Sequence, residues 1–354
     1  MTHSASENSR ASRSPFSIHK AGNDPRAAAL VAVAKVLAGE EGSQTALDKA
    51  LGSPHLVPSD KSLCTELVYG HLRWHIRLEF FSGRFLRRPD KLPWEMVLTL
   101  EQALYSMACL RIPHRAAVHW AEEHVRNRFG QAMAKVANGA LRSMQRSLGE
   151  FSDMDVYLKS AGEESGSAAF HSVPVWLWRQ TTAGYGRDEA ALFLEASLHT
   201  SPQGIRLNMA RPGWEASRAE LLRDAGERAV PSGACAIAFE GSLPFEAKTL
   251  VREGRASRQS AASYSILSAS EPLSWPQPLW DCCSGRGGKT MALLEANIDV
   301  ALASDPSTTR MEALSEEYTR LGLPTERRPR LAVGTAQDLA AAMEAGESFG
   351  TVLV

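Results

Sequence analysis

Apolar residues in the first part of the chain recur at helical rather than alternating spacing from about residue 24 onwards. Asp24 can cap the first helix, with Pro25 at its first position. A second helix is expected to begin at Ser59 or Asp60. The breaks between the later helices are expected at Pro93, Pro113 and Gly130. Five or more helices with short connections predict an all-α bundle that ends near residue 150.

The middle of the chain carries a less regular pattern. Residues 172–198 suggest two helices broken at Gly184 and Gly186. The segment GIRLNMA then predicts a strand, GWEASRAELLRDAG a helix and GACAIAFEG another strand. This order is typical of a small α+β subdomain, which we place at residues 151–255.

From Leu279 the pattern changes to short apolar strands that alternate with helices. Strands are expected in PLWDCC, DVALASD, RLAVG and FGTVLV, with helices in KTMALLEAN and TRMEALSEEYTRLG. Such alternation predicts a parallel sheet, here the start of a doubly wound, Rossmann-like α/β domain at residues 256–354. The predicted organisation is therefore a tail at 1–22, a helical domain at 23–150, the α+β subdomain and this α/β domain.

Composition adds limits to this outline. A length of 354 residues with 44% hydrophobic and 22% charged residues is typical of a globular protein of two or three domains. No apolar run is long enough to span a membrane, and the polar, serine-rich tail is not a secretory signal. The five cysteines form neither a disulfide framework nor a metal-ligating spacing. We expect a cytoplasmic monomer without a metal ion.

Basic residues are concentrated in the helical half, although the net charge of the chain is only −1. One group follows the second predicted helix and comprises Arg84, Arg87, Arg88 and Lys91; another lies on the last two helices and comprises Arg126, Arg128, Lys135, Arg142 and Arg146. Either these are solvated helix faces, or they form local patches that contact RNA phosphates.

A glycine-rich turn, DCCSGRGGKT, joins the first parallel strand to its helix. A phosphate-binding loop would need glycine at Cys283, and a dinucleotide-binding turn would need it at Thr290. An S-adenosylmethionine pocket needs only a turn where backbone approaches the ligand, followed by an acid that ends the next strand. Gly285, Gly287 and Gly288 supply the turn, and Asp305, about 20 residues on, supplies the acid.

Several segments together resemble the Sun/Nop family of RNA cytosine-C5 methyltransferases. The turn is similar to that family's D-x-C-A-A-P-G-G-K-T motif, and ASDPSTTRMEALSEEYTRLG and EGRASRQSAASY resemble its neighbouring segments. CTELVYGHLRW, RIPHRAAVHWA and VANGALR resemble the NusB-like RNA-binding domain of its bacterial ribosomal RNA members. The resemblance covers nearly all of the chain after the tail. It implies methylation of cytosine C5 in RNA, with small-subunit ribosomal RNA favoured over transfer RNA.

The resemblance also implies roles for individual residues. The methionine part of S-adenosylmethionine would lie against Cys283, Ser284, Gly285, Arg286, Gly287, Gly288 and Lys289. Asp305 would bind the ribose, and Thr335 would lie near the adenine. Ser284, Gly285 and Arg286 replace Ala-Ala-Pro, so Arg286 brings a cation that could meet the cofactor carboxylate. Thr335 stands where the family has an acid, for which Asp338 is a weak substitute.

The family's catalytic cysteines lie in an Asp-x-Pro-Cys motif and a later Thr-Cys motif, and residues 1–354 contain neither. A cysteine thiolate must add to C6 of the cytosine before C5 can take the methyl group. We expect the catalytic residues beyond Val354, the chain as given to be a fragment or a truncated form without activity, and Cys282 and Cys283 to be structural. The alternatives are a non-catalytic RNA-binding protein with a decayed methyltransferase fold and a phosphate-binding NTPase.

Overall fold

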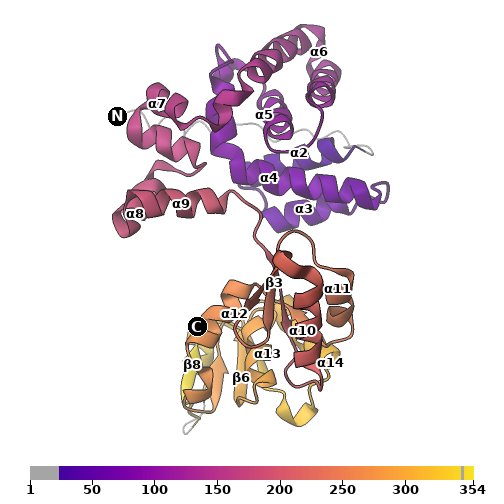
Figure 1. The fold of residues 1–354 in the computed structure, drawn as a ribbon, viewed down its shortest axis with the longest axis vertical. Helices are drawn as coiled ribbons and strands as arrows, with labels where there is room; N and C mark the ends of the chain where they lie inside the picture. Colours follow the sequence, from indigo (N-terminus) through magenta and orange to yellow (C-terminus); the bar gives the residue numbers. More distant parts are fainter. Residues whose placement is uncertain (1–23, 344–346) are drawn as a thin grey trace. The chain divides into compact units, whose positions relative to one another are not determined.

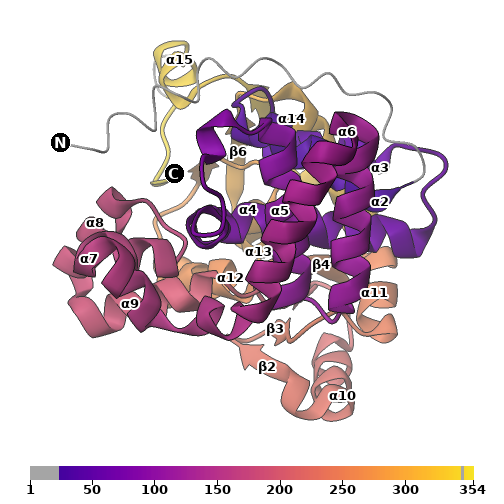
Figure 2. The ribbon, with the colours of Figure 1, turned by 90° about the horizontal axis from the view of Figure 1, so that it is seen from above.

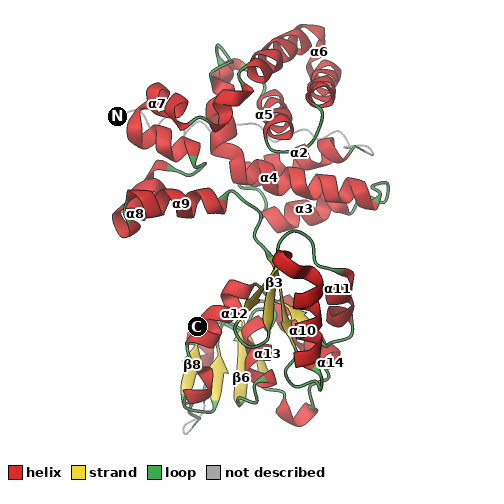
Figure 3. Cartoon of the chain, viewed as in Figure 1, coloured by secondary structure: helices red, strands yellow, loops and turns green. Residues whose placement is uncertain are grey.

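The computed structural model describes residues 24–343 and 347–354, so the tail predicted at 1–22 lies outside the described residues. The chain forms two compact units, one ending at His199 and the other spanning Thr200–Val354. Every strand of the described residues belongs to the second unit (Figure 3). The predicted domain boundaries after residues 150 and 255 stay a prediction. In the structure, residues 151–199 belong to the helical unit, and residues 200–255 share a unit with the parallel sheet.

The first unit is built from helices (Figure 1). They are α2 (Pro25–Leu37), α3 (Ser43–Leu51), α4 (Pro58–Gly83), α5 (Trp94–Ala108), α6 (His114–Arg146), α7 (Met154–Phe170), α8 (Val175–Tyr185) and α9 (Arg187–Ser197), with short 3₁₀ turns at Pro89–Lys91 and Leu148–Ser152. Asp24 caps α2 as predicted, because its side chain accepts a hydrogen bond from the backbone N–H of Arg26 at 2.9 Å. The break predicted at Gly130 is a kink inside α6, where φ is +82°.

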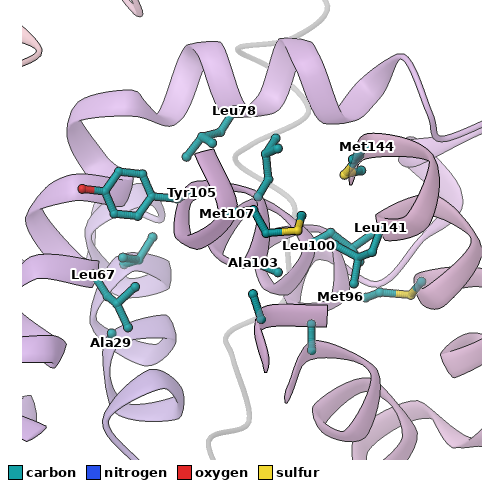
Figure 4. Packing of buried hydrophobic residues seen from close by; sticks show 14 of the residues in the cluster. Ala29, Leu67, Leu78, Met96, Leu100, Ala103, Tyr105, Met107, Leu141 and Met144 are labelled. Carbon is teal, nitrogen blue, oxygen red and sulfur yellow. The ribbon is translucent and has the colours of Figure 1, made fainter. Parts of the chain in front are cut away.

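A single apolar core holds α2 to α7 together. Helices α5 and α6 lie side by side (Figure 2), and Figure 4 shows Met96 and Leu100 of α5 in the same cluster as Leu141 of α6. Buried Arg77 of α4 donates to the carbonyl oxygen of Phe151 and lies 3.9 Å from the ring centroid of Phe170. This cation packed among aromatic rings ties α7 to the bundle.

The second unit contains a small antiparallel sheet of order β2-β3-β1-β4. Its strands are β1 (Gln203–Leu207), β2 (Ala229–Ser232), β3 (Ala236–Phe239) and β4 (Ala256–Arg258), and its helices are α10 (Trp214–Ala225), α11 (Phe245–Arg252) and α12 (Ala261–Ala269). The predicted strand–helix–strand segment is therefore β1, α10 and β3. Strand β2 contains Pro231, a residue that argues against a strand, and β4 has only three residues, too few to show a period in the sequence.

The second sheet of this unit is parallel, with the order β7-β6-β5-β8. Its strands are β5 (Leu279–Asp281), β6 (Val300–Asp305), β7 (Arg330–Val333) and β8 (Thr351–Leu353), connected through α13 (Gly288–Glu295), α14 (Thr308–Leu321) and α15 (Ala336–Ala341). The predicted fold class, helices followed by a doubly wound α/β region, is confirmed. The strand order reverses between β5 and β8, and ligands of such sheets bind at the carboxyl ends of the strands beside that point.

One apolar core serves both sheets of the second unit, because Ile205 and Ile237 of the small sheet belong to the same cluster as Leu293 of α13 and Leu314 of α14. The small sheet is therefore packed against α14 and against α13, the helix that follows the glycine-rich turn. None of the helices in the described parts of the chain is long and apolar enough to cross a membrane.

Candidate cofactor site

The glycine-rich turn lies at the carboxyl end of β5 and leads into α13. Its shape is held by Ser284, whose backbone N–H and hydroxyl both donate to the carbonyl oxygen of Ser304 at 3.0 Å. Gly287 then donates to the carbonyl oxygen of Ser284 at 2.8 Å. Gly285 and Gly287 have φ angles of +56° and +85°, a region that glycine adopts without steric cost.

The acid predicted to bind ribose, Asp305, lies directly beside this turn at the end of β6. Its carboxylate accepts from the backbone N–H groups of Gly285 at 3.2 Å and Ser307 at 2.9 Å. The exposed guanidinium of Arg310 lies 3.4 Å away. Since two carboxylate oxygens offer about four acceptor positions, Asp305 retains capacity for a hydroxyl of a ligand. The turn and the acid therefore lie side by side, and their joint binding of a cofactor stays a prediction.

The face of the turn away from the core is open. Cys283, Arg286 and Gly288 are exposed, and Lys289 is half-buried. A Cβ atom built on Gly285 would meet no atom within 4 Å, and one on Gly288 would meet only Nε2 of Gln259, at 3.9 Å. This Nε2 is buried and has no hydrogen-bond partner within the described residues. An exposed strip of backbone with an unsatisfied donor beneath it fits a ligand that carries hydrogen-bond acceptors.

Thr335 and Asp338 lie at the carboxyl end of the next strand, β7. Thr335 caps α15, and its hydroxyl donates to the Asp338 carboxylate at 2.6 Å. The N–H of Gly334 donates to the backbone carbonyl of Asp305 at 3.3 Å, which places this segment beside Asp305. The exposed Asp338 carboxylate is thus bonded to Thr335, and its role as a substitute for the family's acid stays a prediction.

A buried carboxylate that the sequence reasoning left out, Asp281, supports the turn from the end of β5. It accepts a hydrogen bond from the hydroxyl of Thr290 in α13 at 2.6 Å. Burial raises the pKa of the Asp281 carboxyl, and the hydrogen bond from Thr290 opposes this shift. Asp281 and Thr290 are the first and last residues of the segment DCCSGRGGKT. Their place at the two ends of this turn is the sequence signal that could have identified them.

A second support was also missed and comes from the small sheet. Arg206 of β1 is fully buried and forms a two-pronged ion pair with Glu295 of α13, at 3.0 and 2.7 Å. Its remaining nitrogen donates to the carbonyl oxygen of Gly288 at 2.9 Å and to the side-chain oxygen of Gln259. The buried guanidinium of Arg206 therefore supports the open backbone of the turn from its core side, through the hydrogen bond to Gly288.

The remaining sequence predictions concern Arg286 and the cysteines. Arg286 is exposed, and within residues 24–343 and 347–354 it forms no ion pair, so its expected contact with a cofactor carboxylate stays a prediction. Cys282 is buried against Trp280 and Leu302, as expected of a structural residue. Cys283 is exposed beside the turn, so it contributes no core packing.

The chain is similar in sequence to known proteins. Residues 23–146 match the NusB family. The probable ribosomal RNA small subunit methyltransferase B of Bacillus subtilis is 29% identical over 310 residues, which cover 83% of this chain and 65% of that protein. The ribosomal RNA small subunit methyltransferase B of Pseudomonas syringae pv. tomato is 28% identical over 312 residues, which cover 86% and 66%.

The fold is also found in the crystal structure of PH0851. That structure matches 88% of this chain and 70% of its own chain with a TM-score of 0.57 at 19% identity. The present chain spans 65% and 66% of the lengths of the two bacterial relatives. Residues 23–146 therefore match the NusB family, and the chain is similar in sequence to the bacterial ribosomal RNA small subunit methyltransferases B over most of its length, which confirms the resemblance to the Sun family seen in its sequence.

Proposed function

We propose that this chain binds S-adenosylmethionine and RNA and serves the methylation of cytosine C5 in small-subunit ribosomal RNA, in the cytoplasm. The observation that carries the proposal is the Asp305 carboxylate, 3.2 Å from the N–H of Gly285 in an open glycine turn. A carboxylate beside an open stretch of backbone supports a ligand with two kinds of group. Its ribose hydroxyls would donate to the carboxylate, and its acceptor groups would lie against the turn. The relatives named as ribosomal RNA methyltransferases support methyl transfer to RNA.

In this proposal each part of the site has a defined task. Asp305 orients the cofactor by accepting hydrogen bonds from its ribose hydroxyls, and the backbone of Gly285 and Gly288 lines its methionine part. Arg206 and Asp281 keep that backbone in place. Bound S-adenosylmethionine would supply an electrophilic methyl group. The thiolate addition at C6 and the proton transfers belong to residues that we do not assign within residues 1–354.

RNA binding is assigned to the NusB-family domain. Arg87, Arg88 and Lys91, between α4 and α5, are exposed, and within the described residues they form no ion pair with an acid. By contrast, Arg84 is bound to Glu150 and Arg126 to Glu122. The unpaired group supports contacts with phosphates, which bind cations without regard to base sequence.

A calorimetric titration of the full chain with S-adenosylmethionine, and separately with ATP, tests this assignment. The proposal predicts saturable binding of S-adenosylmethionine and much weaker binding of ATP, because Cys283 stands where a phosphate-binding loop has its first glycine. Tight ATP binding would favour an NTPase. RNA binding without any cofactor binding would favour the non-catalytic alternative.

A further inference from the structure

Two histidines and a glutamate meet inside the helical unit, which does not contain the glycine turn. His71 and His75 lie one turn apart on α4, and both face Glu101 of α5. The distance to Glu101 Oε2 is 3.1 Å from His71 Nε2 and 3.5 Å from His75 Nδ1. The side chains of His71 and Glu101 are 0% and 1% exposed, and that of His75 is 13% exposed. Three potential metal-binding atoms thus converge in a nearly closed site.

The spacing of these atoms suits a small divalent ion. The three atoms all lie within 4.8 Å of one another. Around a tetrahedral zinc ion with bonds of about 2.0–2.1 Å, neighbouring ligand atoms stand about 3.3 Å apart. The two nitrogen–oxygen distances, 3.1 and 3.5 Å, lie on either side of that value. Histidines at i and i+4 on one helix face are also the usual way in which a helix offers two ligands to zinc.

The charge of the site also favours a cation. Within the described residues, no lysine or arginine forms an ion pair with Glu101. The nearby cation of α4, Arg77, instead donates to the carbonyl oxygen of Phe151 and packs on the ring of Phe170. The two imidazoles are the partners of this buried carboxylate, and a divalent cation placed between the three groups would stabilise its charge further.

We propose that His71 Nε2, His75 Nδ1 and Glu101 Oε2 bind a divalent transition-metal ion, zinc by preference, that fastens α4 to α5. Two imidazoles and one carboxylate are a ligand set that zinc accepts, with water in the fourth position. The partly exposed side of His75 provides the access for this water. The site is independent of the cofactor site, since all three ligands belong to the first unit.

The test uses the tag-free full chain, freed of metal with a chelator and then titrated with zinc chloride by calorimetry. Thermal unfolding is followed by circular dichroism with and without zinc. His75→Ala and Glu101→Gln remove one ligand each. His119→Ala is the matched control, because His119 is an exposed histidine one turn from Glu123 on α6. Loss of an outer partner of a zinc ligand lowers affinity about 10–100-fold, so loss of a ligand is expected to lower it by at least about 100-fold.

The expected result is one zinc ion per wild-type chain and a higher unfolding temperature with zinc, both retained in His119→Ala and lost in the two ligand variants. If Glu101→Gln does not fold, the partly exposed His75→Ala variant carries the comparison. A wild-type chain that takes up no zinc, or zinc uptake that His75→Ala leaves unchanged, would overturn the proposal and leave a hydrogen-bonded cluster only.

Discussion

Two glycines of the same turn are required for different reasons. Gly285 and Gly287 both have positive φ angles, but only Gly287 also faces a neighbour. A Cβ atom at Gly287 would lie 2.2 Å from Cδ1 of Leu314, a side chain that is fully buried in the core. A substitution at Gly285 therefore measures the cost of the backbone conformation alone, and one at Gly287 adds the cost of packing against Leu314.

We predict that Gly285→Ala destabilises the chain by about 1–2 kcal/mol, the cost of a left-handed alanine. Gly287→Ala should destabilise it by about 2–5 kcal/mol, because overpacking against Leu314 adds about 1–3 kcal/mol. Urea unfolding of the wild type and both variants measures the difference. Equal losses for the two variants would mean that Leu314 moves aside without cost.

At the scale of elements, Arg206 links the small sheet to the helix that follows the turn. Arg206→Met should destabilise the second unit by about 3–5 kcal/mol, since it leaves Glu295 buried without its cation. The double variant Arg206→Met/Glu295→Leu should regain most of this stability. Both variants should bind S-adenosylmethionine more weakly, because both remove the donor to Gly288.

Urea unfolding and calorimetry on the same two variants separate these effects. A double variant as unstable as the single one would refute the buried-charge explanation. Unchanged cofactor affinity in the folded double variant would show that Arg206 has no role in positioning the turn.

The sequence predicted the elements whose pattern is local and long enough to repeat. It placed α2, α13, α14 and the parallel strands, and it placed Asp305 beside the turn, because strand ends of a parallel sheet share one edge. It missed Arg206, since a lone arginine inside a strand pattern gives no sign of a partner 89 residues away. It also passed over His71 and His75, whose i, i+4 spacing is the signal that would have drawn attention to them.

At the scale of the whole molecule, RNA affinity should depend strongly on salt. Replacing Arg87, Arg88 and Lys91 by glutamine should lower the slope of log affinity against log salt by about 2–3, roughly one for each lost phosphate contact. Arg126→Gln is the control, because Glu122 already pairs with Arg126. Fluorescence anisotropy with a ribosomal RNA fragment measures the slopes. A slope unaffected by the triple replacement would exclude this loop from the RNA interface.

Binding of cofactor and RNA should not suffice for methyl transfer by residues 1–354. They contain no Asp-x-Pro-Cys motif, and C5 of cytosine stays unreactive until a thiolate adds at C6. We expect no incorporation of tritiated methyl groups into undermethylated ribosomal RNA. Incorporation that Cys283→Ala abolishes would instead make the exposed cysteine of the turn the nucleophile.

The central claim is that Asp305 and the glycine turn form one S-adenosylmethionine site. The most direct measurement is calorimetric titration of S-adenosylmethionine into the wild-type chain, Asp305→Ala and Asp299→Ala, with thermal unfolding to confirm that each is folded. Asp299 is the matched control, an exposed acid just before the same strand, β6. The account predicts that Asp305→Ala weakens binding by about 1–3 kcal/mol through loss of the ribose hydrogen bonds, while Asp299→Ala binds like the wild type. Equal affinity in all three proteins would contradict it.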